Sequence, residues 1–195
     1  MVNLWHDIPP GPDPPEIVYV VVEIPKGSRN KYELHKKLGV FKLDRVLYSS
    51  LFYPGDYGLI PQTFYDDGDP LDILVMTNTP SYVGCLLEAR PIGLFRMTDR
   101  GEPDDKVLAV LNNDPFFAEY NDIDDIPQHF LAEMAHFFSV YKDLEQVRTQ
   151  ALGWEPAAAA RQAIRHAIRL YQKEILSGGI QKPRPGNQKG SGETG

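Results

Sequence analysis

The sequence predicts an α+β protein whose core is mainly β, arranged as a small closed or partly open barrel. In the first half, short segments rich in β-branched and aromatic residues are separated by turns rich in Gly and Pro. In the second half, the apolar residues change to the spacing of helices. Because strands and helices do not alternate along the chain, these patterns disfavour a parallel α/β sheet.

The first half contains all the expected strands. Residues 1–16 carry five prolines and are expected to form an extended lead-in. The β-branched segment 17–24 then predicts a buried strand, and two alternating segments around Leu38-Gly39 predict a hairpin over 31–36 and 39–45. Further strands are expected at 72–78, 86–97 and 106–111, with turns between them at 53–58, 66–70, 78–84 and 99–105.

Two helices are expected in the second half. Apolar residues at 130, 131, 134, 137, 138 and 141 predict a helix over 126–145, with Asp125 capping its first amides and Pro127 in its first turn. A second helix is expected over 157–176, with an apolar stripe formed by Ile164, Ile168, Tyr171 and Ile175. Beside this stripe lies a basic row, Arg161, Arg165, Arg169 and Lys173. The row is either a solvated face or a contact with another subunit or an anion.

The length of 195 residues fits one domain, which we expect over residues 1–176. The composition of residues 177–195 predicts a flexible C-terminal tail. A net charge of −7 argues against nucleic-acid binding. The single Cys85, the lack of a membrane-spanning apolar run and the lack of a signal-peptide pattern at 1–16 predict a cytoplasmic protein.

The segment DDGDPLD, residues 66–72, places four carboxylates in seven residues. Two carboxylates about 5 Å apart repel by roughly 3 kcal/mol at an effective dielectric constant near 20. This segment is therefore a solvated surface turn, a structural Ca²⁺ loop or part of a catalytic metal site. A second acidic cluster, DRGEPDDK at 99–106, could meet it at one rim of a barrel, where Mg²⁺ would find the oxygen ligands it prefers.

Basic and phenolic residues make the catalytic interpretation stronger. Lys31 and Glu33 share one face of a predicted strand, and Glu23 could lie on the neighbouring strand. Arg45, Tyr53, Tyr57, Tyr141 and Lys142 add further donors. Phosphate-binding donors beside a metal pocket are what phosphoryl transfer requires. The chain contains no Walker A motif, no G-x-S-x-G and no G-x-G-x-x-G after a strand, which disfavours nucleoside triphosphatases and serine hydrolases.

Several of these segments together resemble one known family. They are DGDPLDI (67–73), VEIPKGSRNKYE (22–33), DRVLYSSLFYPGDYG (44–58), MTDRGEPDDK (97–106) and HFFSVYKDLE (136–145). In sequence and order they are similar to those of the family I soluble inorganic pyrophosphatases. The resemblance implies a five-stranded OB-type β-barrel with two packed helices and Mg²⁺-dependent hydrolysis of diphosphate to two orthophosphates. It also implies a homo-oligomer, with a hexamer favoured.

The resemblance assigns a role to each candidate residue. Asp67, Asp72 and Asp104 correspond to ligands of an activating pair of Mg²⁺ ions, Asp99 with Asp104 to the site of a substrate-borne metal, and Glu23 to a weaker metal contact. Asp69 corresponds to the general base. The substrate-binding positions are Lys31, Glu33, Arg45, Tyr53, Tyr57, Lys106, Tyr141 and Lys142. Asp104 is preferred to Asp105 because it stands two residues before Lys106, and Asp66 has no implied role.

The alternative is a non-catalytic OB-type binding module whose acidic loops hold a structural cation. The basic and phenolic residues disfavour it, because a structural cation site needs no phosphate-binding side chains.

Overall fold

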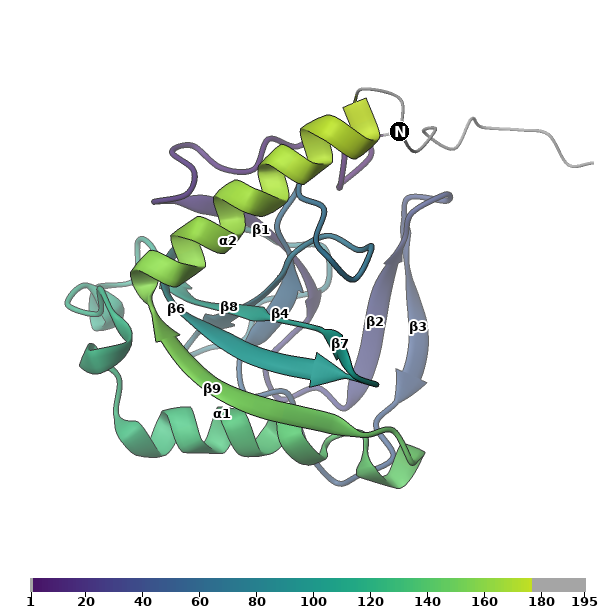
Figure 1. Ribbon diagram of the computed structural model, residues 1–195, viewed down its shortest axis with the longest axis vertical. Coiled ribbons are helices and arrows are strands. Elements are labelled where there is room, and N and C mark those ends of the chain that lie inside the picture. The colour runs from purple at the N-terminus through teal and green to yellow at the C-terminus, as the bar shows by residue number, and fades with distance from the viewer. Residues whose placement is uncertain (1, 177–195) are drawn as a thin grey trace, which may run out of the picture.

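The computed structural model describes residues 2–176, and Figure 1 shows the arrangement of their strands and helices. The strands are β1 (Val18–Ile24), β2 (Asn30–His35), β3 (Val40–Val46), β4 (Asp56–Leu59), β5 (Asp72–Met76), β6 (Leu86–Asp99), β7 (Glu102–Pro103), β8 (Lys106–Leu111) and β9 (Thr149–Pro156). The helices are η1 (Pro115–Phe117), η2 (Ile123–Asp125), α1 (Gln128–Val140), η3 (Asp143–Glu145), α2 (Ala157–Leu170) and η4 (Tyr171–Leu176). The predicted tail, 177–195, lies outside the described residues.

Within residues 2–176, five strands pair in a closed ring. The order around the ring is β1, β4, β5, β8 and β6, and β6 pairs again with β1. Strands β5 and β8 are parallel, and the other neighbours are antiparallel. The prediction of a five-stranded barrel is thereby confirmed, and the arrangement is consistent with the OB type. Hairpin β2–β3 stands beside the ring as a separate sheet (Figure 1).

The strand predictions were confirmed at β1, β2, β3, β5, β6 and β8, but β4, β9 and the two-residue β7 were not predicted. The turn expected at 53–58 contains the start of β4, where Gly58 lies against β1. A Cβ atom at Gly58 would lie 2.0 Å from the Val21 carbonyl oxygen, so glycine is required for this strand contact. Strand β9 pairs with β6. Its residues alternate only weakly between buried and exposed, so its sequence lacks the regular alternation that predicts a strand.

The core lies on both faces of the barrel strands. On β5, Leu74 and Met76 belong to the apolar cluster that includes Met134 and Phe138 of α1. The alternate β5 residues pack in a second cluster with Ala160 and Ile164 of α2. Figure 1 shows α1 and α2 on opposite sides of the barrel. Apolar residues on both faces explain why the strand sequences are continuously hydrophobic.

The helices begin and end slightly differently from the prediction. Helix α1 begins at Gln128 with Pro127 as its N-cap, so the predicted capping role of Asp125 is wrong. Asp125 instead accepts hydrogen bonds from the amides of Asn121 and Asp122, at 2.8 and 3.0 Å, and completes a capping box with Asp122, the N-cap of η2. The second predicted helix is divided between α2 and the π-helical η4, and its stripe packs inward at Ile164, Tyr171 and Ile175.

The proline-rich lead-in folds back on the barrel through turns instead of extending. Trp5 is buried, and its indole Nε1 donates a hydrogen bond to the Thr63 carbonyl oxygen at 2.8 Å. The Trp5 carbonyl accepts from the Gln62 amide at 2.9 Å. The lead-in therefore braces the segment that precedes the acidic loop. Among the described helices, none has the length and apolarity needed to cross a membrane.

Candidate active site

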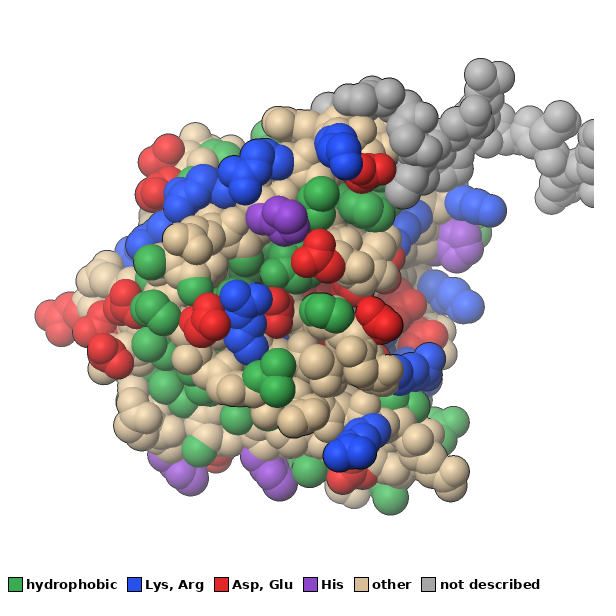
Figure 2. Space-filling view, viewed as in Figure 1, with side chains coloured by type: hydrophobic (Ala, Val, Ile, Leu, Met, Phe, Trp, Pro, Cys, Tyr) green, Lys and Arg blue, Asp and Glu red, His purple; other side chains and the backbone are tan. Residues whose placement is uncertain are grey.

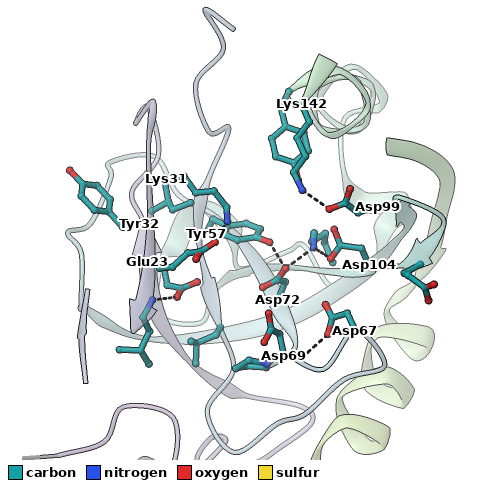
Figure 3. A pocket seen from close by; sticks show the side chains of 18 of the residues that line it. Glu23, Lys31, Tyr32, Tyr57, Asp67, Asp69, Asp72, Asp99, Asp104 and Lys142 are labelled. Carbon is teal, nitrogen blue, oxygen red and sulfur yellow. Dashed lines mark hydrogen bonds and ion pairs between the residues drawn. The ribbon is translucent and has the colours of Figure 1, made fainter. Parts of the chain in front are cut away.

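A cavity of about 510 Å³ opens at one rim of the barrel. It lies at the amino ends of the parallel strands β5 and β8 and at the carboxyl end of β6, with hairpin β2–β3 on one side. Most of the predicted site residues line it: Glu23, Lys31, Glu33, Tyr57, Asp67, Asp69, Asp72, Asp99, Asp104, Lys106, Tyr141 and Lys142. The fold therefore brings the two acidic segments of the sequence to one place (Figure 3).

The first acidic segment enters the cavity as a tight loop. The Asp67 carboxylate accepts a hydrogen bond from the Asp69 amide at 3.0 Å, an Asx-turn. Gly68 has φ +86°, a conformation that glycine adopts without strain, and the Tyr65 amide donates to the Asp69 carbonyl at 2.8 Å. Asp67 and Asp69 consequently lie side by side at the cavity (Figure 3). Partial loss of hydration, together with the charges of Asp72 and Asp104, raises the pKa of Asp67 to about 6.

A buried lysine stands between two carboxylates at the barrel rim. Asp72 and Lys106 are direct partners in the parallel ladder of β5 and β8. The Lys106 ammonium is only 3% exposed, lies 2.6 Å from Asp72 Oδ2 and is also ion-paired with Asp104. Burial alone would lower the pKa of Lys106, but the two carboxylates outweigh it and raise that pKa. The Tyr57 hydroxyl also donates to Asp72, so this carboxylate is held on two sides.

The second acidic segment forms the β6–β7 hairpin. Asp99 pairs with Glu102 around a two-residue turn in which Arg100 and Gly101 have φ of +54° and +89°. The Asp99 Oδ2 atom accepts from Lys142 Nζ at 2.6 Å. Its other oxygen, Oδ1, is buried and has no hydrogen-bond partner. A buried carboxylate oxygen without a donor is a natural position for a cation or an ordered water.

Glu23 is a buried carboxyl group at the base of the cavity. Its Oε1 atom accepts from the Leu34 amide at 2.7 Å, which fixes β1 against hairpin β2–β3. Burial raises the pKa of Glu23 to about 8, and the charge of Asp72 adds to this effect. Lys31 and Glu33, on the neighbouring strand β2, form an ion pair with each other.

The substitution Glu23→Gln should stabilise the metal-free protein at alkaline pH. Because the folded-state pKa lies above the unfolded value, Glu23 costs stability increasingly as pH rises from about 4.5 to about 8. In the presence of a chelator, we expect unfolding free energies of the variant and the original protein to agree within about 1 kcal/mol at pH 5 and to differ by about 2 to 4 kcal/mol at pH 8.5. Urea denaturation at both pH values measures this. An equal difference at both would contradict the assigned cause.

Two predicted substrate-binding residues do not line the cavity. Arg45 lies opposite Lys31 in the β2–β3 ladder, and its guanidinium Nε contacts Glu145 at 3.0 Å. Tyr53 is buried behind Tyr57, with ring centroids 5.4 Å apart. Tyr53 thus supports the cavity wall, and the predicted direct role of both residues remains a prediction.

The structure distinguishes the adjacent Asp104 and Asp105. Asp104 lines the cavity, whereas Asp105 points away from it, is 5% exposed and is ion-paired with Arg96 at 2.6 Å. Side chains of successive extended residues alternate between faces, which is why Asp104 and Lys106 point the same way. Asp66, which had no predicted role, is also outside the cavity, 3.3 Å from His166.

Lys36 and Trp5 are cavity residues that sequence reasoning missed. The Lys36 ammonium is ion-paired with Asp69 and lies 5.1 Å from the centroid of the Trp5 ring. Lys36 comes from the end of β2–β3 and Trp5 from the lead-in, segments with no local acidic pattern. Only the tertiary fold brings these two residues to Asp69, so no spacing in the sequence signals their place.

The donor set fits hard divalent cations. Five aspartates supply carboxylate oxygens, which Mg²⁺ prefers, and Asp99 Oδ1 is a buried acceptor without a donor. In residues 2–176, no group of three or more His, Cys, Asp or Glu side chains is gathered around one point as they stand. Lysines and Tyr57 instead contact the carboxylates at the rim. The carboxylates are therefore suitable ligands for a divalent cation. Lysine and tyrosine donors now contact some of the oxygens that the cation would bind.

The family model described as inorganic pyrophosphatase matches residues 20–172. The chain belongs to the inorganic pyrophosphatase family. The inorganic pyrophosphatase of Haloferax volcanii is 51% identical over 176 residues, which cover 90% of this chain and 99% of that protein. The inorganic pyrophosphatase of Picrophilus torridus is 48% identical over 172 residues, covering 88% of this chain and 97% of the relative.

A solved structure agrees with this membership. The crystal structure of the inorganic pyrophosphatase from Thermus thermophilus superposes with a TM-score of 0.85 at 42% identity, covering 88% of this chain and 99% of that one. The inorganic pyrophosphatase family is metal-dependent, which is consistent with a cavity lined by carboxylates.

Proposed function

We propose that this protein hydrolyses inorganic diphosphate to two orthophosphates, with Mg²⁺ as its cofactor. The observation that carries the proposal is one cavity of about 510 Å³ in which five aspartates face lysines and tyrosines, in a chain of the inorganic pyrophosphatase family. Carboxylates for cations and ammonium groups for phosphate oxygens are both needed for a small substrate with several negative charges.

Basic and phenolic side chains bind the phosphate groups in this proposal. Lys31 of β2, Lys106 of β8 and Lys142, which precedes η3, line the cavity from three separate parts of the chain, so they can contact opposite ends of diphosphate. Tyr57 and Tyr141 add hydroxyl donors. Their pKa values are raised well above that of free tyrosine, first by burial, so both remain protonated donors at neutral pH. No covalent bond between enzyme and phosphate is required.

Asp67, Asp72 and Asp104 would hold the activating Mg²⁺ ions. Asp99 and Asp104 would bind the ion that accompanies diphosphate, and Glu23 would make a weaker contact with a metal ion. When bound, such ions lower the pKa of water and neutralise charge on phosphate oxygens. Lys106 contacts both Asp72 and Asp104, so its ammonium group offsets the repulsion between these two carboxylates when no metal ion is bound. Glu33 lines the same cavity beside Lys31.

Asp69 is the proposed general base. Its side chain is 63% exposed, at the cavity and on the loop that also carries Asp67. The backbone contacts of Asp69 to Asp67 and Tyr65 fix the loop, and they do not use its carboxylate, which in this proposal accepts a proton from the attacking water. The ion pair with Lys36 holds this carboxylate at the cavity.

A phosphate-release assay tests the proposed function. The purified protein should release two orthophosphates per diphosphate in the presence of Mg²⁺ and almost none after treatment with a chelator, with activity restored by added Mg²⁺. Folding is checked in parallel by circular dichroism. If folded protein released no phosphate at any Mg²⁺ concentration, the enzyme proposal would be wrong, and a binding module with a structural cation would be favoured.

We also propose a cytoplasmic location and a homo-oligomeric assembly, with a hexamer favoured. The basic row of α2 and η4 supports a contact surface: Arg165, Arg169 and Lys173 are exposed, and Arg161 is half-buried. Figure 2 shows basic side chains following the line of α2 across the molecule. The molecular mass in solution, measured by light scattering, decides the assembly.

A further inference from the structure

Asp105 is a buried carboxylate that the proposed reaction does not use. It stands next to Asp104 but faces away from the cavity, with 5% of its surface exposed. Its Oδ2 atom lies 2.6 Å from Arg96 Nη1 and accepts a hydrogen bond from the Tyr65 hydroxyl at 3.0 Å. The Met97 amide approaches its Oδ1 atom at 3.4 Å. A buried charge needs such partners, but these partners also connect parts of the chain that are far apart in sequence.

Tyr65 is the residue that closes the acidic loop. Its amide donates to the Asp69 carbonyl at 2.8 Å, and its carbonyl accepts from the Gly68 amide at 2.9 Å. Its side chain is 6% exposed and packs edge-on against His166 of α2, with ring centroids 6.0 Å apart. Any displacement of Tyr65 therefore displaces the peptide that carries Asp67 and Asp69.

The hydroxyl of Tyr65 joins this loop to the strands that form the opposite side of the cavity. Asp105 immediately precedes β8, whose first residue is Lys106, and Arg96 lies on β6 three residues before Asp99. Arg96 is itself held by Glu155 of β9 at 3.2 Å. The three side chains thus connect the loop with strands β6 and β8, at whose cavity ends Asp99, Asp104 and Lys106 stand.

We propose that Tyr65 and Asp105 are positioning residues, which set the distance between the loop carrying Asp67 and Asp69 and the strand ends carrying Asp99 and Asp104. Arg96, which is partly exposed, completes this linkage by holding the buried Asp105 carboxylate. Neither Tyr65 nor Asp105 contacts the cavity, so they act only through the residues they hold. The inference rests on the proposed function, because the distance it concerns is the one that cations and diphosphate would span.

The variants Tyr65→Phe and Asp105→Asn test this linkage, with Glu155→Gln as the matched control. Tyr65→Phe removes only the hydroxyl, and Asp105→Asn keeps the shape of the side chain. Glu155→Gln removes the other ion pair of Arg96, which does not reach the loop. Hydrogen exchange of the metal-free proteins measures the Gly68 and Asp69 amides, calorimetry measures Mg²⁺ affinity, and phosphate release measures the Mg²⁺ concentration for half-maximal activity.

We expect exchange of these two amides to rise about tenfold in both loop variants, as for the loss of one buried hydrogen bond. Mg²⁺ affinity should fall about three- to tenfold, with turnover at saturating Mg²⁺ within about twofold of the original protein. The double variant should be no worse than the poorer single variant, because both remove one linkage. The control should match the original protein in all three measurements.

Two results would overturn the inference. One is unchanged loop exchange and unchanged Mg²⁺ affinity in Tyr65→Phe, whether or not its thermal stability falls, since a merely structural role lowers stability alone. The other is additive effects in the double variant. If the original protein itself released no phosphate, the proposed function would fail instead, and the exchange data on the metal-free loop would still decide the linkage.

Discussion

Replacing Asp69 by Asn should lower turnover by about two orders of magnitude or more, the usual contribution of a general base. Asparagine has nearly the shape of aspartate but cannot accept a proton from water. The backbone contacts of residue 69, to Tyr65 and to the Asp67 side chain, do not involve the lost charge and should persist. Steady-state kinetics at saturating Mg²⁺ and diphosphate measure the loss, and calorimetry should show that Mg²⁺ binding is mostly kept.

Asp66→Asn is the matched control for this experiment. Asp66 belongs to the same loop and is exposed, but it lies outside the cavity and contacts His166. The change removes one negative charge from the loop without removing a proposed catalytic group, so turnover should stay within about twofold. Turnover of Asp69→Asn close to that of the control would refute the assignment of Asp69 as the base.

Lys106→Met should have the second largest effect, on both stability and activity. Methionine fills similar space, but it leaves Asp72 and Asp104 facing each other at the barrel rim without their shared cation. Removing one partner of a buried ion pair costs about 3 kcal/mol or more of stability. Loss of an ammonium that contacts the substrate should also lower turnover about a hundredfold.

Thermal unfolding with and without Mg²⁺ tests the cause of this instability. If the cost comes from two unpaired carboxylates, Mg²⁺ should raise the Tm of Lys106→Met by more than that of the original protein, because the cation offsets the repulsion. Lys37→Met, a change of an exposed lysine at the end of hairpin β2–β3, should leave Tm and turnover unchanged. An equal Mg²⁺ effect in both variants would contradict this explanation.

The sequence predicted the strands whose side chains carry a strong local signal. Segment 106–111 is apolar on both faces and coincides with β8, and the alternation around Leu38-Gly39 predicted the β2–β3 hairpin. Strand β4 was not predicted because Gly58 suggested a turn. In the structure, Gly58 instead allows the backbone of β4 to lie close to β1. The prediction that Asp125 caps helix α1 was wrong, because the Asp125 carboxylate accepts hydrogen bonds from amides at the start of η2.

The fold brings together most of the predicted residues that belong to a local motif, whereas sequence reasoning missed cavity residues that the fold alone places there. The acidic segments pointed to a metal-binding rim, and the structure places their Asp67, Asp69, Asp72, Asp99 and Asp104 around one cavity. The contacts of Lys36 with Asp69 and with Trp5 join residues more than 30 positions apart in the sequence. The Tyr65–Asp105 contact spans 40 positions. Contacts between residues so far apart produce no periodic pattern or motif in the sequence.

The position of β8 has a consequence for how the chain acquires its activity during synthesis. Strand β8 is the last strand of the ring in chain order, yet it inserts between β5 and β6, whose facing edges stay open until it arrives. Unpaired edges of this kind favour association with other chains. The same strand brings Lys106, with Asp104 just before it, so closure of the barrel also gives Asp72 its lysine partner, and Tyr141 and Lys142 complete the cavity later in the chain. A nascent chain that ends before residue 111 is therefore both prone to aggregate and inactive.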